Sequence, residues 1–466
     1  SNYFGLRLQQ DYNQGTTIIG GMMTAVNRNL KDQTLSFLHD SAYTGGLDFY
    51  HAWRKKTYFL SLKTIFSRVH GSPEAILETQ QSPLRYYQRP DAKHLTLDPA
   101  RTSLFGHGGT LEFGKQGGGH IQFVAGLNWR SPGLELNDMG YLRQADDIME
   151  YVWAGYRVWK PFSIFREANI SVNQWAGWNF GGINTYTGGN VNAHGTFKNY
   201  WSGGFGINRN GQALSASALR GGPMLAMSGA WNIWTYLESD MRKKIRFEFM
   251  SSSYDRDNGD QVRRQYELGI TINTSKALNV SIMPSWSTAR LELQYIDTPE
   301  FRGESRYLFG RINQKTLGLT FRLNYSLSPE LSVQFYGQPF IASGKYSRYK
   351  RITNPGTRAY ADRYHVFGGD EIGYDAASET FGIDENGDGA VDYAFDNPNF
   401  NVLEFRSNMV LRWEYVPGSA LYVVWSQGRD GYRPIGDFAF GRDLSNLFDV
   451  HPQNVFLVKF SYCFQL

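Results

Sequence analysis

A short acidic and glycine-rich segment has the residue types and spacing of a calcium-binding loop. Residues 384–392 read Asp-Glu-Asn-Gly-Asp-Gly-Ala-Val-Asp. Alternate residues of such a loop direct their oxygen atoms at one centre, a glycine permits the sharp turn, and hard oxygen donors suit Ca²⁺. The segment predicts a structural Ca²⁺ site whose ligands are Asp384, Asn386, Asp388, the carbonyl of Ala390, and Asp392.

The pattern departs from a complete EF-hand loop at its end. The twelfth position, where a bidentate Glu belongs, holds Phe395, and Asp396 follows one residue late. The segment therefore resembles the Asp-rich calcium loops of extracellular modules, and a solvated Asp/Gly turn is the alternative. Because no general base lies nearby in the sequence, we expect the ion to stiffen a long surface loop over residues 344–399, not to catalyse a reaction.

No other segment has the spacing of a catalytic or cofactor-binding motif. The histidines are scattered, and the Gly-rich stretch from Leu219 to Pro223 lacks the Lys-Ser/Thr pair of a phosphate loop. The single Cys463 excludes an internal disulfide and a Cys-based zinc site. We therefore assign no catalytic residue and no organic cofactor, and a hydrolase with His beside Ser or Asp stays an alternative.

Aromatic and amide residues gather between positions 160 and 205. Sugar-binding tracks use this composition, because aromatic faces stack on the C–H faces of sugars while amides pair with hydroxyl groups. The candidate glycan contacts are Trp175, Trp178, Tyr186 and Trp201. An aromatic girdle at a membrane interface is the alternative interpretation of the same residues.

The elements that must position these groups are β-strands. In residues 317–325 apolar and polar side chains alternate strictly, and successive side chains of a strand point to opposite faces. This alternation recurs along a chain with 15% aromatic residues and without the blade repeats of a soluble propeller. The pattern predicts an all-β fold in a single domain, residues 1–466: a large antiparallel transmembrane outer-membrane β-barrel of about 18 strands with long extracellular loops.

Short and long connections predict the orientation of the barrel. Outer-membrane barrels have short periplasmic turns and long extracellular loops. The closing strand from Phe456 to Leu466 alternates like the recognition signal of bacterial outer-membrane barrels, so we expect a periplasmic C-terminus. By the same count the first strand, Tyr3 to Gln10, runs inward. This direction predicts earlier strands upstream or a strand miscounted near 184–208.

Several stretches resemble a family of uncharacterised Gram-negative outer-membrane proteins. They are Asn2 to Arg28, Gln88 to Asp91, Trp129 to Tyr141, Leu219 to Pro223, the calcium-type loop, and Arg412 to Ser419. Members of that family join an N-terminal carbohydrate-binding family-nine-like domain to a C-terminal barrel domain of unknown function. Only the barrel domain is matched here. The resemblance implies an outer-membrane location and a link to glycans.

Together these features favour passage or capture of a nutrient, such as an oligosaccharide, at the barrel. The expected partners are outer-membrane lipid, an oligosaccharide ligand and other outer-membrane or periplasmic proteins. A formal net charge of +4 is too small to predict nucleic acid. Two alternatives stay open: a structural, assembly or secretion component of an outer-membrane complex, and an outer-membrane hydrolase.

Overall fold

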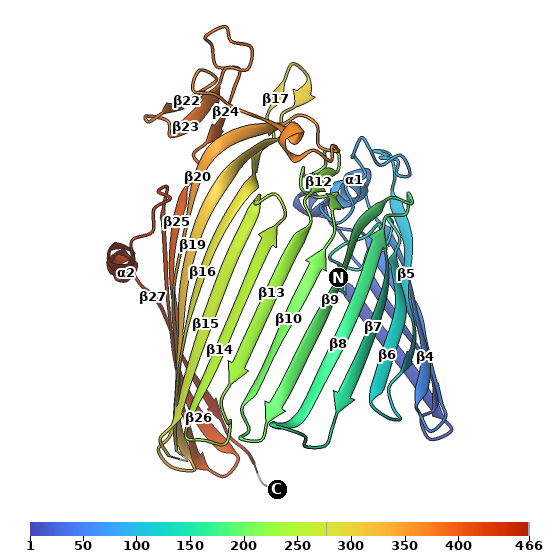
Figure 1. The fold of residues 1–466 in the computed structure, drawn as a ribbon, viewed down its shortest axis with the longest axis vertical. Coiled ribbons are helices and arrows are strands. Elements are labelled where there is room, and N and C mark those ends of the chain that lie inside the picture. The colour runs from blue at the N-terminus through green and yellow to red at the C-terminus, as the bar shows by residue number, and fades with distance from the viewer. Residues whose placement is uncertain (276, 465–466) are drawn as a thin grey trace.

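The computed structural model of the protein describes residues 1–275 and 277–464, so the predicted end of the closing strand, Gln465 and Leu466, lies outside the described residues. One 20-stranded antiparallel sheet curls around an enclosed space (Figure 1). All its strands except the short β21 (Tyr364–Val366) follow one another as an up-and-down meander: β1 (Asn2–Tyr12), β2 (Thr17–Asn27), β3 (Ser41–Trp53), β4 (Tyr58–His70), β5 (Ser103–Lys115), β6 (Ile121–Arg130), β7 (Asp147–Val158), β8 (Phe165–Trp178), β9 (Asn184–Phe197), β10 (Ser202–Asn210), β13 (Ala230–Glu238), β14 (Ile245–Arg256), β15 (Gln261–Asn273), β16 (Leu278–Asp297), β19 (Leu308–Ser326), β20 (Leu331–Ile352), β25 (Phe400–Val416), β26 (Ser419–Arg433) and β27 (Gln453–Ser461). The prediction of an all-β fold built on one large antiparallel barrel sheet is confirmed.

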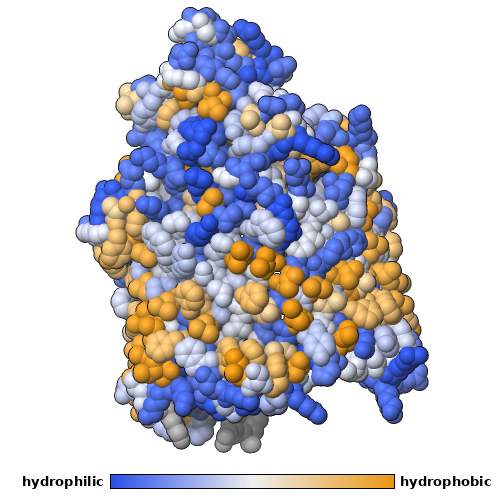
Figure 2. Space-filling model, viewed as in Figure 1, coloured by the Kyte–Doolittle hydropathy of each residue, from blue (hydrophilic) through white to orange (hydrophobic). Residues whose placement is uncertain are grey.

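Alternation divides the wall into an outer and an enclosed face. On β19, Leu317 pairs with Trp286 and Phe321 with Ile282, and these apolar side chains share the outer face. Arg322 and Asn324 alternate with them and face the enclosed space. Figure 2 shows the outer residues as a hydrophobic band across the wall, with hydrophilic residues beyond it toward both ends.

The two ends of the wall differ in the length of their connections. Tight turns, such as residues 13–16, 54–57 and 417–418, join strands at one end, and the long connections lie at the other (Figure 1). The longest connection begins later than the predicted residue 344, because β20 keeps its pairing with β19 and continues to Ile352. The loop therefore spans residues 353–399.

Shorter elements decorate the long-connection end. α1 (Pro73–Gln81) begins where Ser72 Oγ accepts the N–H of Ala75 at 3.2 Å, with Pro73 in the first turn, and it lies inside the mouth of the sheet. α2 (Phe440–Asp449) lies on the outer face, where Leu447 is buried. The remaining short elements are η1 (Gln33–Leu35), β11 (Ala213–Ser215), β12 (Leu225–Met227), β17 (Glu300–Phe301), β18 (Glu304–Ser305), η2 (Tyr360–Arg363), β22 (Ile372–Asp375), β23 (Thr380–Ile383) and β24 (Tyr393–Asp396). In the described ranges, neither α-helix has the length or the apolar content needed to cross a membrane.

The first and last strands are the edges of the meander. β1 runs from the long-connection end into the turn at residues 13–16, and β27 descends antiparallel to β26 from the same end. Both edge strands therefore run from the long-connection end to the tight-turn end. For β1, this is the direction that the strand count from the sequence predicted. The region 184–208 holds β9 and β10, correctly paired in order, so the direction of β1 does not come from a miscount there. No pairing between β1 and β27 occurs among the described residues.

Candidate functional site

Three long connections fold inward across the mouth of the enclosed space. We call residues 71–102, 131–146 and 211–229 the mouth cap. Their apolar side chains pack against side chains of the wall near the long-connection end and form small hydrophobic clusters with them. The contact clusters are Ile76 and Tyr87 with Val26, Ala42, Val69 and Leu104; Leu134 and Leu142 with Ile65; and Leu219 and Leu225 with Phe309 and Ile352. The mouth cap is therefore packed structure, not a set of free surface loops.

The wall is shaped to receive the mouth cap at Gly106 of β5. A Cβ at this position would lie 2.0 Å from the backbone nitrogen of Leu134, so only glycine admits the loop backbone so closely. Beside it, Ser67 Oγ on β4 accepts the N–H of Glu135 at 2.9 Å. Strand and loop thus interlock through backbone contact.

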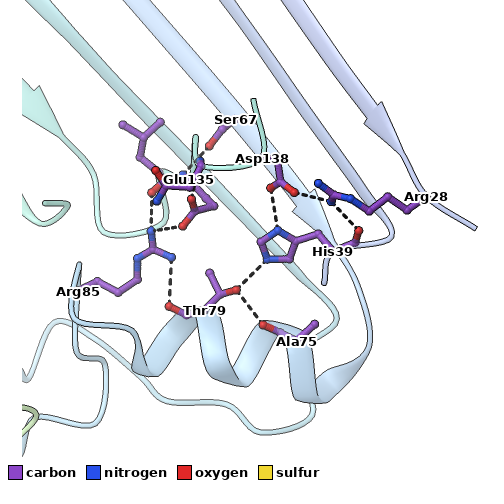
Figure 3. A network of polar contacts seen from close by, with 10 residues as sticks. Arg28, His39, Ser67, Ala75, Thr79, Arg85, Glu135 and Asp138 are labelled. Atoms are coloured by element: carbon purple, nitrogen blue, oxygen red, sulfur yellow. Dashed lines mark hydrogen bonds and ion pairs between the residues drawn. The ribbon is translucent and has the colours of Figure 1, made fainter. Parts of the chain in front are cut away.

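Asp138 is the centre of the first polar network (Figure 3). Its carboxylate accepts hydrogen bonds from Arg28 Nη1 at 2.5 Å and from His39 Nδ1 at 2.8 Å. Burial raises the pKa of Asp138, but the hydrogen bonds from His39 and Arg28 outweigh it and hold that pKa below its ordinary value of 3.8. This carboxylate joins the mouth cap to the rim segment 28–40.

The same network has the order of a catalytic triad, from Asp138 through His39 to Thr79. His39 Nε2 lies 2.8 Å from Thr79 Oγ1, and Thr79 donates its own proton to the carbonyl of Ala75 at 2.8 Å. The threonine proton therefore points at a backbone carbonyl, whereas the proton of an activated nucleophile points at the imidazole. Because Thr79 is also a buried residue of α1 itself, we assign this network to holding α1 in place.

Arg85 and Glu135 form the most buried ion pair of the mouth cap. Arg85 Nη2 donates to Glu135 Oε2 at 2.7 Å and to the carbonyl of Leu134 at 2.9 Å (Figure 3). Arg85 Nη1 reaches the carbonyl of Thr79 at 3.2 Å, so one guanidinium links residues 71–102 to residues 131–146. A buried ion pair is tolerated only when both members keep their partners.

A second carboxylate, Asp146, links the mouth cap to the connection between β8 and β9. Its oxygens lie 3.0 and 2.9 Å from His94 Nε2, and Oδ1 accepts the N–H of Phe180 at 2.9 Å. Arg89 Nη2 lies further away, 3.5 Å from Oδ2. The carboxylate is thus shared by three segments that are distant in the sequence.

The segment 211–229 connects opposite sides of the mouth. The N–H of Met224 donates to Asp91 Oδ2 at 2.6 Å, and the N–H of Ala226 donates to the carbonyl of Pro355 at 2.8 Å. The guanidinium of Arg220 lies 3.8 Å from the ring centroid of Tyr295 on β16. Through these contacts the mouth cap spans from the wall of β2–β5 to that of β16–β20.

Amide side chains line the enclosed wall of β8–β13. We call Asn173, Asn190, Asn208 and Asn232 the amide ladder, because they donate to one another in sequence order at 2.6, 2.8 and 2.9 Å. Trp175 lies over Gly188 and Trp234 over Gly206, next to the ladder. The sequence analysis missed the ladder as a unit. Its signal is the repetition of Asn at enclosed positions of four successive strands.

The four candidate glycan contacts do not form one track. Trp175 and Tyr186 share the enclosed face, two positions apart along the pairing of β8 with β9. Trp178 alternates to the outer face, and Trp201 lies in the tight turn between β9 and β10 at the other end of the wall. Their closeness in sequence brings only Trp175 and Tyr186 together.

The calcium-type loop lies between β23 and β24, far from the mouth cap (Figure 1). Asp384 accepts the N–H groups of Gly387 and Gly389, each at 2.7 Å, and Asp392 Oδ2 accepts that of Glu385 at 2.8 Å. Phe395, at the twelfth position, is buried and stacks on Phe381. In the described residues no three His, Cys, Asp or Glu side chains gather as a metal site. Calcium binding stays a prediction.

Glu385 anchors this loop to the top of the wall. It accepts from Arg306 Nε at 3.0 Å and from Tyr393 Oη at 2.7 Å, and Arg351 forms an ion pair with it. Burial raises the pKa of Glu385, while the hydrogen bonds from Tyr393, Arg306 and Arg351 outweigh burial and lower it. The carboxylate therefore stays ionised and joins the three-stranded sheet of β22, β23 and β24 to β20 and to the segment just before β19.

Several solved structures match this chain at low similarity. The FrpB iron transporter from Neisseria meningitidis (F3-3 variant) matches with a TM-score of 0.42 at 8% identity, covering 91% of this chain and 74% of that chain. The siderophore receptor PirA from Acinetobacter baumannii gives a TM-score of 0.38 at 8% identity, covering 91% and 73%. A bacterial polysaccharide outer membrane secretin gives 0.30 at 11% identity, covering 70% and 87%.

Sequence comparison identifies the family. No curated protein matches the sequence. The carbohydrate-binding domain that the resemblance implies stays a prediction. A family model described as a domain of unknown function (DUF5916) matches residues 1–465, and the chain belongs to that family.

Proposed function

We propose that the chain forms the wall of a bacterial outer-membrane barrel that passes a polar nutrient, with the mouth cap as its gate. The observation that carries the proposal is the mouth cap itself. Three connections from one end fold into the enclosed space, where buried ion pairs fix two of them and apolar packing holds the third. A barrel of this width encloses a lumen, so an inward-folded cap controls access to it.

The outer wall supports insertion in a membrane. Large apolar side chains stay exposed on the outer face, including Leu47, Phe247 and Val458. The rings of Trp53 and Tyr58 stack at 6.1 Å beside the tight-turn end, as in an aromatic girdle. An exposed apolar band with aromatic margins suits lipid and not water. The short turns then face the periplasm, as does the C-terminus, and the mouth cap faces outward.

The lining supports a polar solute, and an oligosaccharide is the leading candidate. The amide ladder offers donors and acceptors for hydroxyl groups, and the rings of Trp175 and Trp234 offer faces for stacking. A cavity of about 750 Å³ lies against the mouth cap. Its polar lining on the enclosed side includes Arg7, Lys63, Asn128, Arg130 and Arg143.

Single-channel recording in planar bilayers tests the proposed gate. We expect the natural protein to conduct weakly and the Arg85→Ala variant, whose cap has lost its buried pair, to conduct several-fold more. Maltooligosaccharides should then interrupt the current. The Arg406→Gln variant, which removes an exposed pair of the wall, is the matched control. A silent bilayer with both variants, each correctly folded, would contradict transport and favour the structural or assembly role.

Calcium binding at residues 384–392 is a separate part of the proposal. The loop would gain rigidity from Ca²⁺ without contributing to passage, because it lies beyond the mouth cap. Titration calorimetry with CaCl₂ should show one binding event that the Asp384→Ala variant loses. Asp370→Ala, an acidic residue elsewhere in the same connection, is the control. Equal heats from all three proteins would contradict a calcium site at this loop.

A further inference from the structure

We propose that a cavity between the mouth cap and the β7–β9 wall binds the anionic group of a sugar-sized solute, a carboxylate or a phosphate. The inference rests on the proposed function and names the charge class of the solute that it admits. The cavity measures about 260 Å³, which is the size of a monosaccharide and not of a long polymer. The residues that carry the argument are Arg85, Arg89, Arg143, Asp146 and Asn179.

Buried hydrogen-bond donors without acceptors point to an anion. The Arg89 side chain is 1% exposed, and neither its Nε nor its Nη1 has an acceptor in the described protein. The same holds for Arg85 Nε and for Nδ2 of the buried Asn179. All of these atoms are N–H donors of residues that line the cavity. Native proteins rarely leave such groups unpaired, and a planar guanidinium matches the geometry of a carboxylate or phosphate.

The neighbouring acceptors are already committed. Asp146 holds His94 and the N–H of Phe180 at 2.9 to 3.0 Å, which leaves it 3.5 Å from Arg89. Glu135 accepts from Arg85 Nη2 at 2.7 Å and from the N–H of Asn137 at 2.8 Å. Neither carboxylate can turn toward the free donors without losing these bonds. An anionic ligand would supply the missing acceptor.

Charge and access point the same way. Three guanidinium groups and one carboxylate line the cavity, so its lining has an excess of positive charge. Arg143 is exposed and has no carboxylate partner among the described residues. It lines both this cavity and the larger one of about 750 Å³. Arg143 thus places a positive charge at both cavities.

Polar groups beside the cationic side chains suit the remainder of a sugar. Thr185, Ser215 and Ser217 bring hydroxyl groups to the lining, and Gln144 brings an amide. The hydroxyl of Tyr186 donates to Asp147 at 3.1 Å, so this ring is fixed as one wall. A cavity with one anion-binding side and a hydroxyl-rich side distinguishes acidic from neutral sugars.

Titration calorimetry on the detergent-purified full-length protein tests the proposal with D-glucuronate, D-glucose 6-phosphate and D-glucose. We expect an acidic sugar to bind at least tenfold more tightly than glucose, and the better of the two identifies the anionic group. Arg143→Gln should weaken that binding about tenfold, and Arg89→Gln should abolish it. Because Arg89→Gln removes a buried charge, unchanged thermal melting is required of it. Arg143→Gln alters no buried contact and stays informative.

Arg322→Gln, on the enclosed face of β19 above Tyr336, is the matched control and should bind like the natural protein. Equal binding of all three sugars, or binding that survives both Arg143→Gln and Arg89→Gln, overturns the proposal. Failure of the anion-site proposal can be told apart from failure of the transport proposal. Conductance without acidic-sugar binding contradicts only the anion site, whereas binding by a protein that never conducts contradicts only transport.

Discussion

The mouth cap and the enclosed face of the wall both contain Arg–carboxylate ion pairs, but the pair in the cap is buried and the pair on the wall is exposed to solvent. Arg85 and Glu135 expose 0% and 6% of their side chains, whereas Arg406 and Asp430 on the enclosed face of β25 and β26 expose 47% and 52%. A buried charge that loses its partner has no water to replace it, but an exposed one does. We infer that the buried ion pairs hold the mouth cap in place, whereas the exposed charges on the enclosed face of the wall remain available to solutes.

The largest effect is expected from breaking the buried pair. Arg85→Ala should destabilise the closed mouth cap by about 3–5 kcal/mol, because Glu135 is left buried without a cation. Hydrogen exchange should then lose protection in residues 71–102 and 131–146 together. The double variant Arg85→Met with Glu135→Leu, which removes both charges, should regain most of the protection. Exchange that stays slow in Arg85→Ala would show that packing alone closes the mouth.

Two glycines, one under the mouth cap and one that the cap does not cover, allow a comparison of the wall with and without the cap. Gly106→Ala places a Cβ against Leu134, and overpacking of this kind costs about 1–3 kcal/mol. At Gly5 on β1 an added Cβ meets nothing within 4 Å, so Gly5→Ala is the control. Limited proteolysis of the mouth cap should accelerate in the first variant only. Equal rates would mean that the loop backbone does not rest on β5.

A smaller effect should appear as a dependence on pH. The pKa of Asp138 is lowered in the folded protein, so its contribution to stability is fully present above 3.8 and is lost as the pH falls through the lowered value. Proteolytic cleavage of residues 131–146 should therefore increase when the pH falls below 3.8 and through the lowered pKa of Asp138. Asp138→Asn should be cleaved faster at neutral pH and change less with acid. A variant with the natural acid response would assign the effect to other carboxylates.

The smallest effect on structure is expected from the exposed pair. Arg406→Gln leaves Asp430 in contact with solvent, so melting and hydrogen exchange should match the natural protein. The charge balance of the lumen changes, however, and cation selectivity measured under a salt gradient should rise. A clear loss of stability would contradict the view that lumen charges are structurally free.

The wall was predictable because strand alternation is local information. The faces of residues 317–325 and of the closing strand follow from a period of two, and the structure has them as expected as far as Ser461, where β27 ends short of the predicted Leu466. The strand number was close for the same reason. The end of β20 was not predictable, since the polar stretch after Gly344 is held as strand by its partner β19.

The mouth cap was not predictable because its contacts are distant in the sequence. Arg85 finds Glu135 fifty residues away, and nothing in either local segment indicates the other. Conversely, Trp178 and Trp201 are near Trp175 in the sequence but point outward or lie at the other end of the sheet. Nearness along the chain indicated a common site only where the side chains also shared a face.

The two edge strands impose a rule of parity. β1 and β27 point the same way, and each leaves one row of backbone N–H and C=O groups without a strand partner among the described residues. Such groups must be paired within a membrane. Since direction reverses at every step of an antiparallel sheet, an antiparallel closure of these two edges would require an odd number of intervening strands. A second copy turned about the barrel axis presents the same two directions again, so two such sheets alone would meet in parallel seams.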